Sequence, residues 1–286
     1  MKVVICGITG LIGKTVKVAL EAEGYEVVGV YRDDLAIGVS HLQDVIEGAE
    51  AVVNLAGAPV LKKWTKDYKL QIYNSRIYTT RLLVEAINGM QLPPKNFISA
   101  SAVGIYDEIN VHDEFSSNFS SDFMASVCRD WENEVLKLKR DKVCLSIFRL
   151  GIVISSRGGA LKKMLLPFKF GLGGKLGSGN QYLPWIHLDD VVRAIVGDIA
   201  IPWTSGVYNL VAPEVLTNIE FTHKLAKVLH RPAFIKIPEW VLKLVYGEGS
   251  KLLISGQQVI PQRILADGFE FLFPTLSSAL EKELIK

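Results

Sequence analysis

The sequence predicts an α/β protein built on a Rossmann-type, doubly wound parallel sheet, with a smaller mixed α/β lobe towards its C-terminal end. Short apolar runs alternate with helical patterns through residue 150, which is typical of parallel strands covered by helices on both faces. After residue 150 the composition changes, and residues 171–179 are rich in glycine. We therefore expect a core domain over residues 1–155 and a second part over 156–286, with some core elements returning near 187–212.

The first half of the chain alternates strands and helices. Residues 3–6 are apolar on both faces, as in a buried parallel strand, and residues 11–23 have helical spacing up to Gly24, which suits a helix cap. Residues 33–40 are ambiguous, and the third strand of a doubly wound sheet is weak there. The same patterns predict strands at 27–31, 51–55, 97–100 and 143–150, one long helix over 66–90, and another helix over 122–140.

The second half is more mixed. The pattern predicts a helix over 189–201 and a strand at 207–211. Thr217 and Glu220 have the spacing of a capping box, which predicts a helix from there to about residue 230. The tail alternates short strands and helices in the segments AFIKIP, EWVLKLVYG, GFEFLFP and TLSSALEKEL, and it is too apolar to be disordered.

Composition narrows the functional classes. The 286 residues carry 32 basic and 30 acidic side chains, a formal net charge of +2, which gives no reason to propose nucleic acid or a membrane surface as a partner. The three cysteines, Cys6, Cys128 and Cys144, are widely spaced, so we expect no metal site and no disulfide framework. The sequence has no secretory signal pattern and no apolar run of about 20 residues. We expect a cytoplasmic protein.

The segment GITGLIG follows the first predicted strand and opens the first predicted helix. Gly7 permits a tight turn, Gly10 lets the backbone approach a pyrophosphate, and Gly13 lets the helix pack closely on the sheet. Backbone N–H groups and the helix dipole then face the phosphates. The spacing is GxxGxxG rather than GxGxxG, and the alternative is a glycine turn that binds nothing.

The end of the second predicted strand bears on which dinucleotide is bound. A fold that binds NAD usually places a carboxylate there for the ribose hydroxyls, whereas this chain has Tyr31 and Arg32. A guanidinium suits a 2′-phosphate, which favours NADP(H) over NAD. Asp33 and Asp34 follow directly, and the alternative is that Arg32 is a solvated turn residue.

Seven segments, spread over nearly the whole chain, resemble one known group of proteins. They are GITGLIG, NLAGAP, NSRIYTTRLLVEAI, SASAVGIY, CRDWE, LPFKFGLGGKLGSGNQYLPWIHLDD and GQQVIPQRILADGFEF. These segments are similar to the atypical extended short-chain dehydrogenase/reductases, in the subgroup usually called epimerase family proteins. The resemblance implies a Rossmann core that binds NADP(H) and a distinctive C-terminal domain.

The resemblance, together with the patterns above, implies the cofactor contacts. The stretch 33–45 is short compared with many relatives, which puts the third strand in doubt. The candidate cofactor-binding residues are Gly7, Thr9, Gly10, Leu11, Ile12 and Gly13 of the first turn, Tyr31 and Arg32 at the adenosine phosphate, Leu55, Ala56 and Gly57 beside the adenine and ribose, Arg76, Ser99 and Ala100 near the cofactor, and Ile152 at the nicotinamide end.

The resemblance also shows what this chain lacks. Ordinary members of the superfamily use a Tyr-x-x-x-Lys pair for proton transfer, helped by an upstream serine or threonine. The upstream part is present as Ser99 and Ser101, in SAS. The helix that should carry the pair reads DFMASVCRDWE, where one alignment gives Phe123 with Val127 and the other gives Met124 with Cys128. Neither register supplies a phenol or an ammonium group.

Three residues are the catalytic candidates: Ser101, Tyr106 and His187. Tyr106 is the nearest tyrosine and would serve as a displaced acid, or it is a packing residue. His187 would donate a proton near neutral pH, or it is a hydrogen-bonded histidine beside a capped helix. Arg149 would meet a substrate phosphate or carboxylate, or it forms an ion pair at the edge of the core. Cys128 would be a nucleophile, or a small core residue.

These features indicate an NADP(H)-binding protein with two functional interpretations. The first is an oxidoreductase or epimerase-like enzyme that acts on a sugar nucleotide or a carbonyl compound through hydride transfer. The substrate is expected between SAVGIY, the 171–179 loop and WIHLDD, where the loop is either a lid over the substrate or an ordinary surface turn. The second is a non-catalytic protein that senses NADP(H) or has a regulatory role. The absent Tyr/Lys pair favours the second and the retained serines favour the first. A homo-oligomer is left open.

Overall fold

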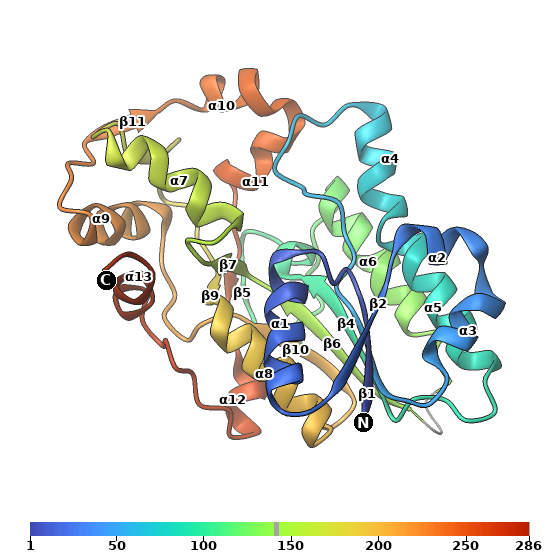
Figure 1. The fold of residues 1–286 in the computed structure, drawn as a ribbon. Coiled ribbons are helices and arrows are strands. Elements are labelled where there is room, and N and C mark those ends of the chain that lie inside the picture. The colour runs from blue at the N-terminus through green and yellow to red at the C-terminus, as the bar shows by residue number, and fades with distance from the viewer. Residues whose placement is uncertain (140–142, 286) are drawn as a thin grey trace.

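A computed structural model of the chain describes residues 1–139 and 143–285. A parallel six-stranded sheet lies between two layers of helices, and a smaller lobe covers the carboxyl ends of its strands (Figure 1). The predicted α/β architecture is confirmed. The strands of the sheet are β1 (Lys2–Cys6), β2 (Glu26–Val30), β3 (Ala49–Asn54), β4 (Asn96–Ala102), β6 (Cys144–Leu150) and β10 (Gly206–Leu210).

The order of the strands creates a crevice near the N-terminal strand. The order is β10-β6-β4-β3-β1-β2, and every neighbouring pair is parallel. From β1 the chain runs outward to β2 and then returns to the other side of β1 as β3. Connections that leave β1 in opposite directions open a space at the carboxyl ends of β1 and β3, where open α/β sheets bind ligands.

The strands are buried on both faces because their side chains alternate between two cores. Val3 and Ile5 of β1 pack on one face, whereas Val4 and Cys6 pack on the other. One layer contains α1 (Leu11–Ala22), α8 (Leu188–Ala200) and the short α12 (Gln262–Ala266). The opposite layer contains α3 (Val39–Ile46), α5 (Ile77–Gly89) and α6 (Phe123–Val135).

The weak third strand is a helical segment in the structure. Residues 33–45 lie in α2 (Arg32–Ile37) and α3, which are separated by Gly38 with a φ of +114°. Asp34 starts α2 by accepting a hydrogen bond from the Tyr31 N–H at 2.8 Å. An aspartate near the first turn favours a helix over a strand, so β2 is left as the edge of the sheet.

The single helix predicted over 66–90 is wrong, because the structure has two helices there, α4 (Lys66–Asn74) and α5. They are separated at Ser75 and Arg76. The Ser75 hydroxyl donates to the Ile72 carbonyl at 3.0 Å and accepts from the Ala58 N–H at 2.9 Å. Such a side-chain hydrogen bond competes with the helix ladder, and here it also ties the break to the loop after β3.

The helix predicted over 122–140 is shorter than expected. Asp122 caps α6 by accepting a hydrogen bond from the Ala125 N–H at 2.8 Å. The helix ends at Val135, and Arg140 lies outside the described residues.

The β4 strand leads into a 3-10 turn, η1 (Val103–Ile105).

The lobe has its own apolar core, in which α9 packs against α13. The capping box that was predicted at Thr217 and Glu220 is confirmed at the start of α9. The elements of the lobe and of its contacts with the core are β5 (Val111–His112), β7 (Ile152–Ile154), α7 (Gly159–Lys169), β8 (Gly174–Leu176), β9 (Trp185–His187), α9 (Asn218–Val228), β11 (Ile235–Ile237), α10 (Glu239–Tyr246), η2 (Gly247–Ser250), α11 (Lys251–Ile254), β12 (Gln258–Val259) and α13 (Leu276–Leu284).

The segment GFEFLFP was expected to be a strand, and this is wrong. Residues 268–274 are irregular, and the buried Asp190 carboxylate accepts hydrogen bonds from the Leu272 and Phe273 N–H groups at 2.7 and 3.1 Å. A carboxylate on α8 therefore takes the backbone donors that a neighbouring strand would take. In the described ranges, no helix is long and apolar enough to cross a membrane.

Candidate functional site

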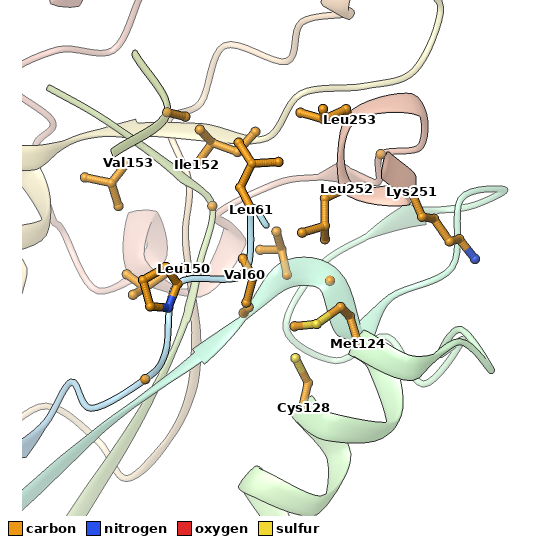
Figure 2. Close-up of a pocket in the computed structure, with 18 of the residues that line it drawn as sticks. Val60, Leu61, Met124, Cys128, Leu150, Ile152, Val153, Lys251, Leu252 and Leu253 are labelled. Atoms are coloured by element: carbon orange, nitrogen blue, oxygen red, sulfur yellow. The ribbon is translucent and has the colours of Figure 1, made fainter. Parts of the chain in front are cut away.

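A cavity of about 1630 Å³ opens at the carboxyl ends of the strands (Figure 2). Pockets for drug-sized ligands span roughly 300–1,000 Å³, so this cavity can hold a dinucleotide together with a second molecule. One side is formed by the turns after β1, β3, β4 and β6. The other side is formed by α6, by the start of α7 and by the segment from α10 through residue 257.

The glycine turn closely contacts the loop that follows β3. Gly7 has a φ of +85°, and a Cβ placed on it would lie 2.7 Å from the Leu55 carbonyl carbon. A Cβ on Gly13 would lie 2.4 Å from the Gly7 carbonyl oxygen. Both positions therefore require glycine. The close contact at Gly13 is with the glycine turn, whereas the sequence predicted a contact between the helix and the sheet.

The first turn of α1 offers its backbone amides to the cavity. Gly10 precedes the helix without a side chain that could cap it, and Leu11, Ile12 and Gly13 line the cavity. The first N–H groups of a helix lack partners within the helix, and the helix dipole favours an anion there. This geometry fits a phosphate group.

Most of the predicted cofactor residues line the cavity. Thr9, Tyr31, Arg32 and Ser99 lie outside its lining. Tyr31 and Arg32 are exposed at the end of β2, and Ser99 is fully buried with its hydroxyl 3.3 Å from the Ala100 carbonyl oxygen. The predicted residues that line the cavity are Gly7, Gly10, Leu11, Ile12, Gly13, Leu55, Ala56, Gly57, Arg76, Ala100 and Ile152.

Arg76 is a cation beneath the loop after β3. Its guanidinium donates to the Ile72 and Ala58 carbonyls at 3.1 and 3.2 Å, and it lies over the Trp131 ring at 5.3 Å. A Cβ on Gly57 would come within 2.9 Å of this guanidinium. Burial lowers the pKa of Arg76 below its ordinary value. The side chain therefore supports the turn that contains Gly57 and brings a positive charge to the cavity.

The structure decides the register of α6 that the sequence left open. Met124 and Cys128 both line the cavity (Figure 2). In the other register Phe123 lines it, but Val127 is fully buried and lies outside the lining. Met124 and Cys128 are four residues apart and lie on one face of the helix. Burial raises the pKa of the Cys128 thiol to about 12, so the thiol is protonated at neutral pH. Cys128 is a small apolar lining residue, and the nucleophile alternative has no support.

Ser101 lines the cavity and joins a buried ion pair. Its hydroxyl donates to Glu132 Oε1 at 2.6 Å. The same carboxylate receives two hydrogen bonds from Arg149, at 2.8 Å to Oε1 and 2.7 Å to Oε2. Burial alone would lower the pKa of Arg149, but the hydrogen bonds and the charge of Glu132 raise it above its ordinary value. Arg149 is thus the ion-pair partner that was one of the two expectations.

Tyr106 is placed away from the cavity, behind Ser101. It is fully buried, and its hydroxyl lies 2.6 Å from Arg149 Nη1 and 2.9 Å from Asn209 Oδ1. Its ring stacks on His112 with centroids 4.6 Å apart. Burial raises its pKa above the ordinary value. This position matches the packing alternative, and a role as displaced acid has no support in the geometry.

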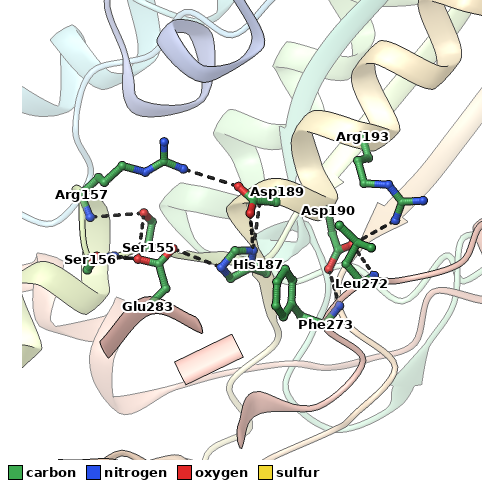
Figure 3. Close-up of polar contacts among 10 residues, drawn as sticks. All are labelled: Ser155, Ser156, Arg157, His187, Asp189, Asp190, Arg193, Leu272, Phe273 and Glu283. Carbon is green, nitrogen blue, oxygen red and sulfur yellow. Dashed lines mark hydrogen bonds and ion pairs between the residues drawn. The ribbon is translucent and has the colours of Figure 1, made fainter. Parts of the chain in front are cut away.

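His187 is also fully buried and lies outside the cavity lining. Its Nε2 donates to Glu283 Oε1 at 3.1 Å, and its Nδ1 accepts from the Asp189 N–H at 3.1 Å (Figure 3). Burial lowers the pKa of His187, so the neutral ring that this pattern requires is favoured. The histidine links β9 to α13 and matches the hydrogen-bonded alternative, with no geometry for proton transfer to a ligand.

The wall opposite the glycine turn comes from residues that sequence reasoning missed. The 171–179 loop and residues 185–190 were expected to enclose the substrate, but the cavity lies elsewhere, because β8 within that loop pairs with β11. Residues 247–257 provide the wall instead. The segment GQQVIPQRILADGFEF, which carried no assigned role, contributes Gly256 and Gln257 to this wall, whereas Leu252 and Leu253 precede it and gave no signal in the sequence. Among the residues that the structure describes, no group of three or more His, Cys, Asp or Glu side chains is arranged to hold a metal ion.

Two families of known proteins match separate parts of the chain. Residues 3–200 match the NAD dependent epimerase/dehydratase family, and residues 237–283 match a domain of unknown function, DUF1731. The human epimerase family protein SDR39U1 is 36% identical to this chain over 300 residues, which cover 100% of both proteins. A relative from Arabidopsis thaliana, named as a chloroplastic homolog of SDR39U1, is also 36% identical and covers 98% of this chain and 86% of its own.

Solved structures of an epimerase family protein and of an epimerase also resemble this chain. The crystal structure of human epimerase family protein SDR39U1 (isoform 2) with NADPH has a TM-score of 0.92 at 35% identity, over 99% of each chain. The UDP-glucuronic acid 4-epimerase of Bacillus cereus, in complex with UDP-glucuronic acid and NAD, has a TM-score of 0.78 at 18% identity, over 99% of this chain and 98% of its own. The second is a likeness of fold alone.

Proposed function

The chain belongs to the NAD dependent epimerase/dehydratase family, and from this premise we propose that it binds NADP(H) along the carboxyl edge of its sheet. The observation that carries the proposal is the interlocked pair of turns after β1 and β3. Gly7 and Gly13 permit a contact that any side chain would block, and this contact presents the first amides of α1 to the cavity. The relative solved with NADPH supports the choice of dinucleotide.

In this proposal, each predicted cofactor residue has a place. The first amides of α1, at Leu11 and Ile12, hold the pyrophosphate. Thr9 and Gly10 shape the turn beside it, and the Gly10 N–H itself donates to the Gly7 carbonyl at 3.0 Å. The loop of Leu55 to Gly57, held by Arg76, lies beside the adenine and ribose. Ser99 and Ala100 support the middle of the cofactor, and Ile152 lies at the nicotinamide end. When bound, the nicotinamide supplies or accepts hydride.

The 2′-phosphate is assigned to Arg32, with Tyr31 beside it. The neighbouring Asp34 would repel a phosphate if its carboxylate were free, but both of its oxygens have partners. Oδ2 accepts from the Tyr31 N–H and Oδ1 lies 2.8 Å from His41 Nε2. Arg32 is exposed at the start of α2, and this leaves a guanidinium available for a phosphate that only NADP(H) carries.

We further propose an oxidoreductase role in which Ser101 contacts the substrate oxygen. Among the three predicted catalytic residues, Ser101 is the one that lines the cavity. Ser101 donates its proton to Glu132, and Arg149 holds Glu132. The Ser101 oxygen therefore has a defined position and accepts a hydrogen bond from a substrate hydroxyl. The alternative is a non-catalytic NADP(H) sensor. It is favoured by Met124 and Cys128, which occupy the helix face where ordinary relatives present their proton donor.

Nucleotide-dependent stabilisation tests the cofactor assignment. A ligand at 100 times its dissociation constant should raise the free energy of unfolding by about 2.7 kcal/mol. We expect NADPH to raise the unfolding temperature at concentrations at which NADH has little effect. Equal stabilisation by NADH, or none by either, would contradict the proposal.

Label transfer separates the enzyme from the sensor. The protein is incubated with NADPH deuterated at the transferable position and with a panel of carbonyl compounds and sugar nucleotides. Deuterium appearing in a product supports the enzyme. Tight NADPH binding without transfer to any compound of the panel supports the sensor.

A further inference from the structure

The half of the cavity opposite the glycine turn has apolar walls (Figure 2). Its lining comes from three directions: Val60 and Leu61 after β3, Met124 on α6, and Leu252 and Leu253 on α11. These side chains are distant in sequence and gather around one space. An apolar wall of this kind binds apolar surface, because that surface leaves water on binding.

Most charged residues of this half are paired within the protein. Lys251 lies 3.0 Å from Asp122 Oδ2 and 3.8 Å from Glu108 Oε1. Lys243 lies 3.8 Å from Glu239, and Glu248 is paired with Lys69. The ion pair of Lys251 with the cap of α6 also fixes α11, and with it Leu252, over the cavity.

Two lysines of the lining have no carboxylate partner in the described chain, and both are exposed at its rim. Lys163 donates to the Leu61 carbonyl at 3.3 Å, and Lys62 lies 5.2 Å from the centroid of the Tyr68 ring. A sugar nucleotide brings a second pyrophosphate, whose two charges need unpaired cations or backbone N–H groups when they leave water. The interior of this half offers apolar side chains in that place.

From these contacts we propose that the molecule bound beside the nicotinamide is an uncharged, largely apolar compound, such as an aliphatic or aromatic ketone or its alcohol, and not a sugar nucleotide. The inference rests on the proposed NADP(H) function and specifies the second ligand of the same site. Its small polar end lies beside Ser101, whose proton is donated to Glu132 and whose oxygen accepts a hydrogen bond from the hydroxyl of the alcohol form. Its apolar body contacts Met124, Leu252 and Leu253.

Displacement of a neutral fluorescent dye tests the inference. Nile red is bound to the full chain in the presence of saturating NADPH, and menthone, acetophenone or UDP-glucose is added. We expect the two ketones to displace the dye and UDP-glucose to leave it bound. Displacement by UDP-glucose, or no displacement by either ketone, overturns the inference.

Variants of the C-terminal wall locate the site. Leu252→Glu places a carboxylate in the apolar half, and Leu253→Gln is a milder change if the first variant fails to fold. We expect menthone to bind roughly ten-fold or more weakly to each. Leu244→Glu is the matched control, because Leu244 is 73% exposed on α10 and outside the lining, and it should leave binding unchanged. Unchanged menthone binding in both wall variants contradicts the inference.

The same samples separate this inference from the proposed function. Thermal stabilisation by NADPH is measured on each protein without ketone. Absence of stabilisation in the unaltered protein overturns the proposed function, and with it the inference that depends on it. Stabilisation by NADPH without ketone binding overturns the substrate class alone and leaves the cofactor assignment in place.

Discussion

The two sides of the cavity are built by different means. On the glycine side, backbone contacts backbone: Gly7 lies against Leu55, and the first amides of α1 face the space. On the opposite side, side chains form the surface, and an ion pair between Lys251 and Asp122 holds α11 over α6. The first side depends on which residues lack a side chain, and the second depends on which side chains meet.

The two sides therefore respond differently to substitution. A backbone cradle tolerates almost any surrounding sequence, provided that its glycines are kept. A wall of side chains changes whenever the residues of α6 or of the segment 247–257 change. Variants that damage one side and spare the other will test this division.

The largest effect is expected in the support of the side-chain wall. Glu132→Gln removes the charge that pairs with Arg149, which is only 4% exposed, and leaves a buried guanidinium without its counter-charge. We expect the free energy of unfolding to fall by about 3–5 kcal/mol, measured by urea denaturation. Glu134→Gln on the same helix is the control, with a loss of about 1 kcal/mol, because Arg81 and Lys137 are exposed. Equal losses in the two variants would refute this explanation.

The second effect breaks the backbone cradle. Gly7→Ala combines a left-handed φ with a Cβ against Leu55, which should cost about 2–4 kcal/mol and abolish stabilisation by NADPH. Gly24→Ala isolates the cost of the left-handed backbone, because Gly24 has a φ of +84° and a Cβ there would meet open space. We expect this control to lose about 1–2 kcal/mol and to keep NADPH binding. Thermal unfolding with and without NADPH gives both readouts, and retained NADPH binding in Gly7→Ala would show that the turn is not the cradle.

The third effect concerns Arg32, the side chain proposed to bind the 2′-phosphate at the edge of the cradle. Arg32→Ala should weaken NADPH binding by roughly ten-fold to a hundred-fold, the range of a charge-assisted hydrogen bond, and leave NADH binding unchanged. Titration calorimetry measures both affinities. Lys17→Ala on α1, whose side chain pairs with Glu21, controls for the loss of one positive charge. If this control weakens NADPH binding as much as Arg32→Ala, the assignment of the phosphate to Arg32 is wrong.

The smallest effect is a pH dependence in the lobe. His187 faces Glu283, Asp189 and Asp190, but burial dominates and lowers its pKa, so the unfolded chain binds the proton more readily. Its contribution to stability is therefore complete above the unfolded pKa of about 6.5 and is lost as the pH falls below it. We expect a loss of about 1 kcal/mol, because protonation removes the bond from the Asp189 N–H to Nδ1.

Urea denaturation between about pH 5.5 and 7.5 measures this dependence. Glu283 stays ionised in this range, because burial, which raises its pKa, is outweighed by its hydrogen bonds with Ser156 and by the nearby His187, which lower it. His187→Gln should flatten the profile relative to the unaltered protein. His223→Gln, an exposed position on α9, should leave it unchanged. A profile that persists in His187→Gln would assign the proton to another group.

The sequence by itself determined the features that depend on neighbouring residues. The buried strands, the glycine turn, and the capping box of Thr217 and Glu220 follow from steric and hydrogen-bonding rules that act within a few positions. The break at Ser75 escaped the same reading, because the Ser75 hydroxyl also binds Ala58, which lies 17 positions earlier.

Only the tertiary structure decided which side chains meet. Tyr106 and His187 have residue types that suit proton transfer, but contacts with Asn209 and Glu283, far along the chain, hold them outside the cavity. The register of Met124 and Cys128, and the wall contributed by Leu252, likewise depend on how α6 and α11 pack. Sequence patterns report the faces of single elements, whereas a cavity is formed by the faces of several elements, whose relative placement is set by packing over the whole fold.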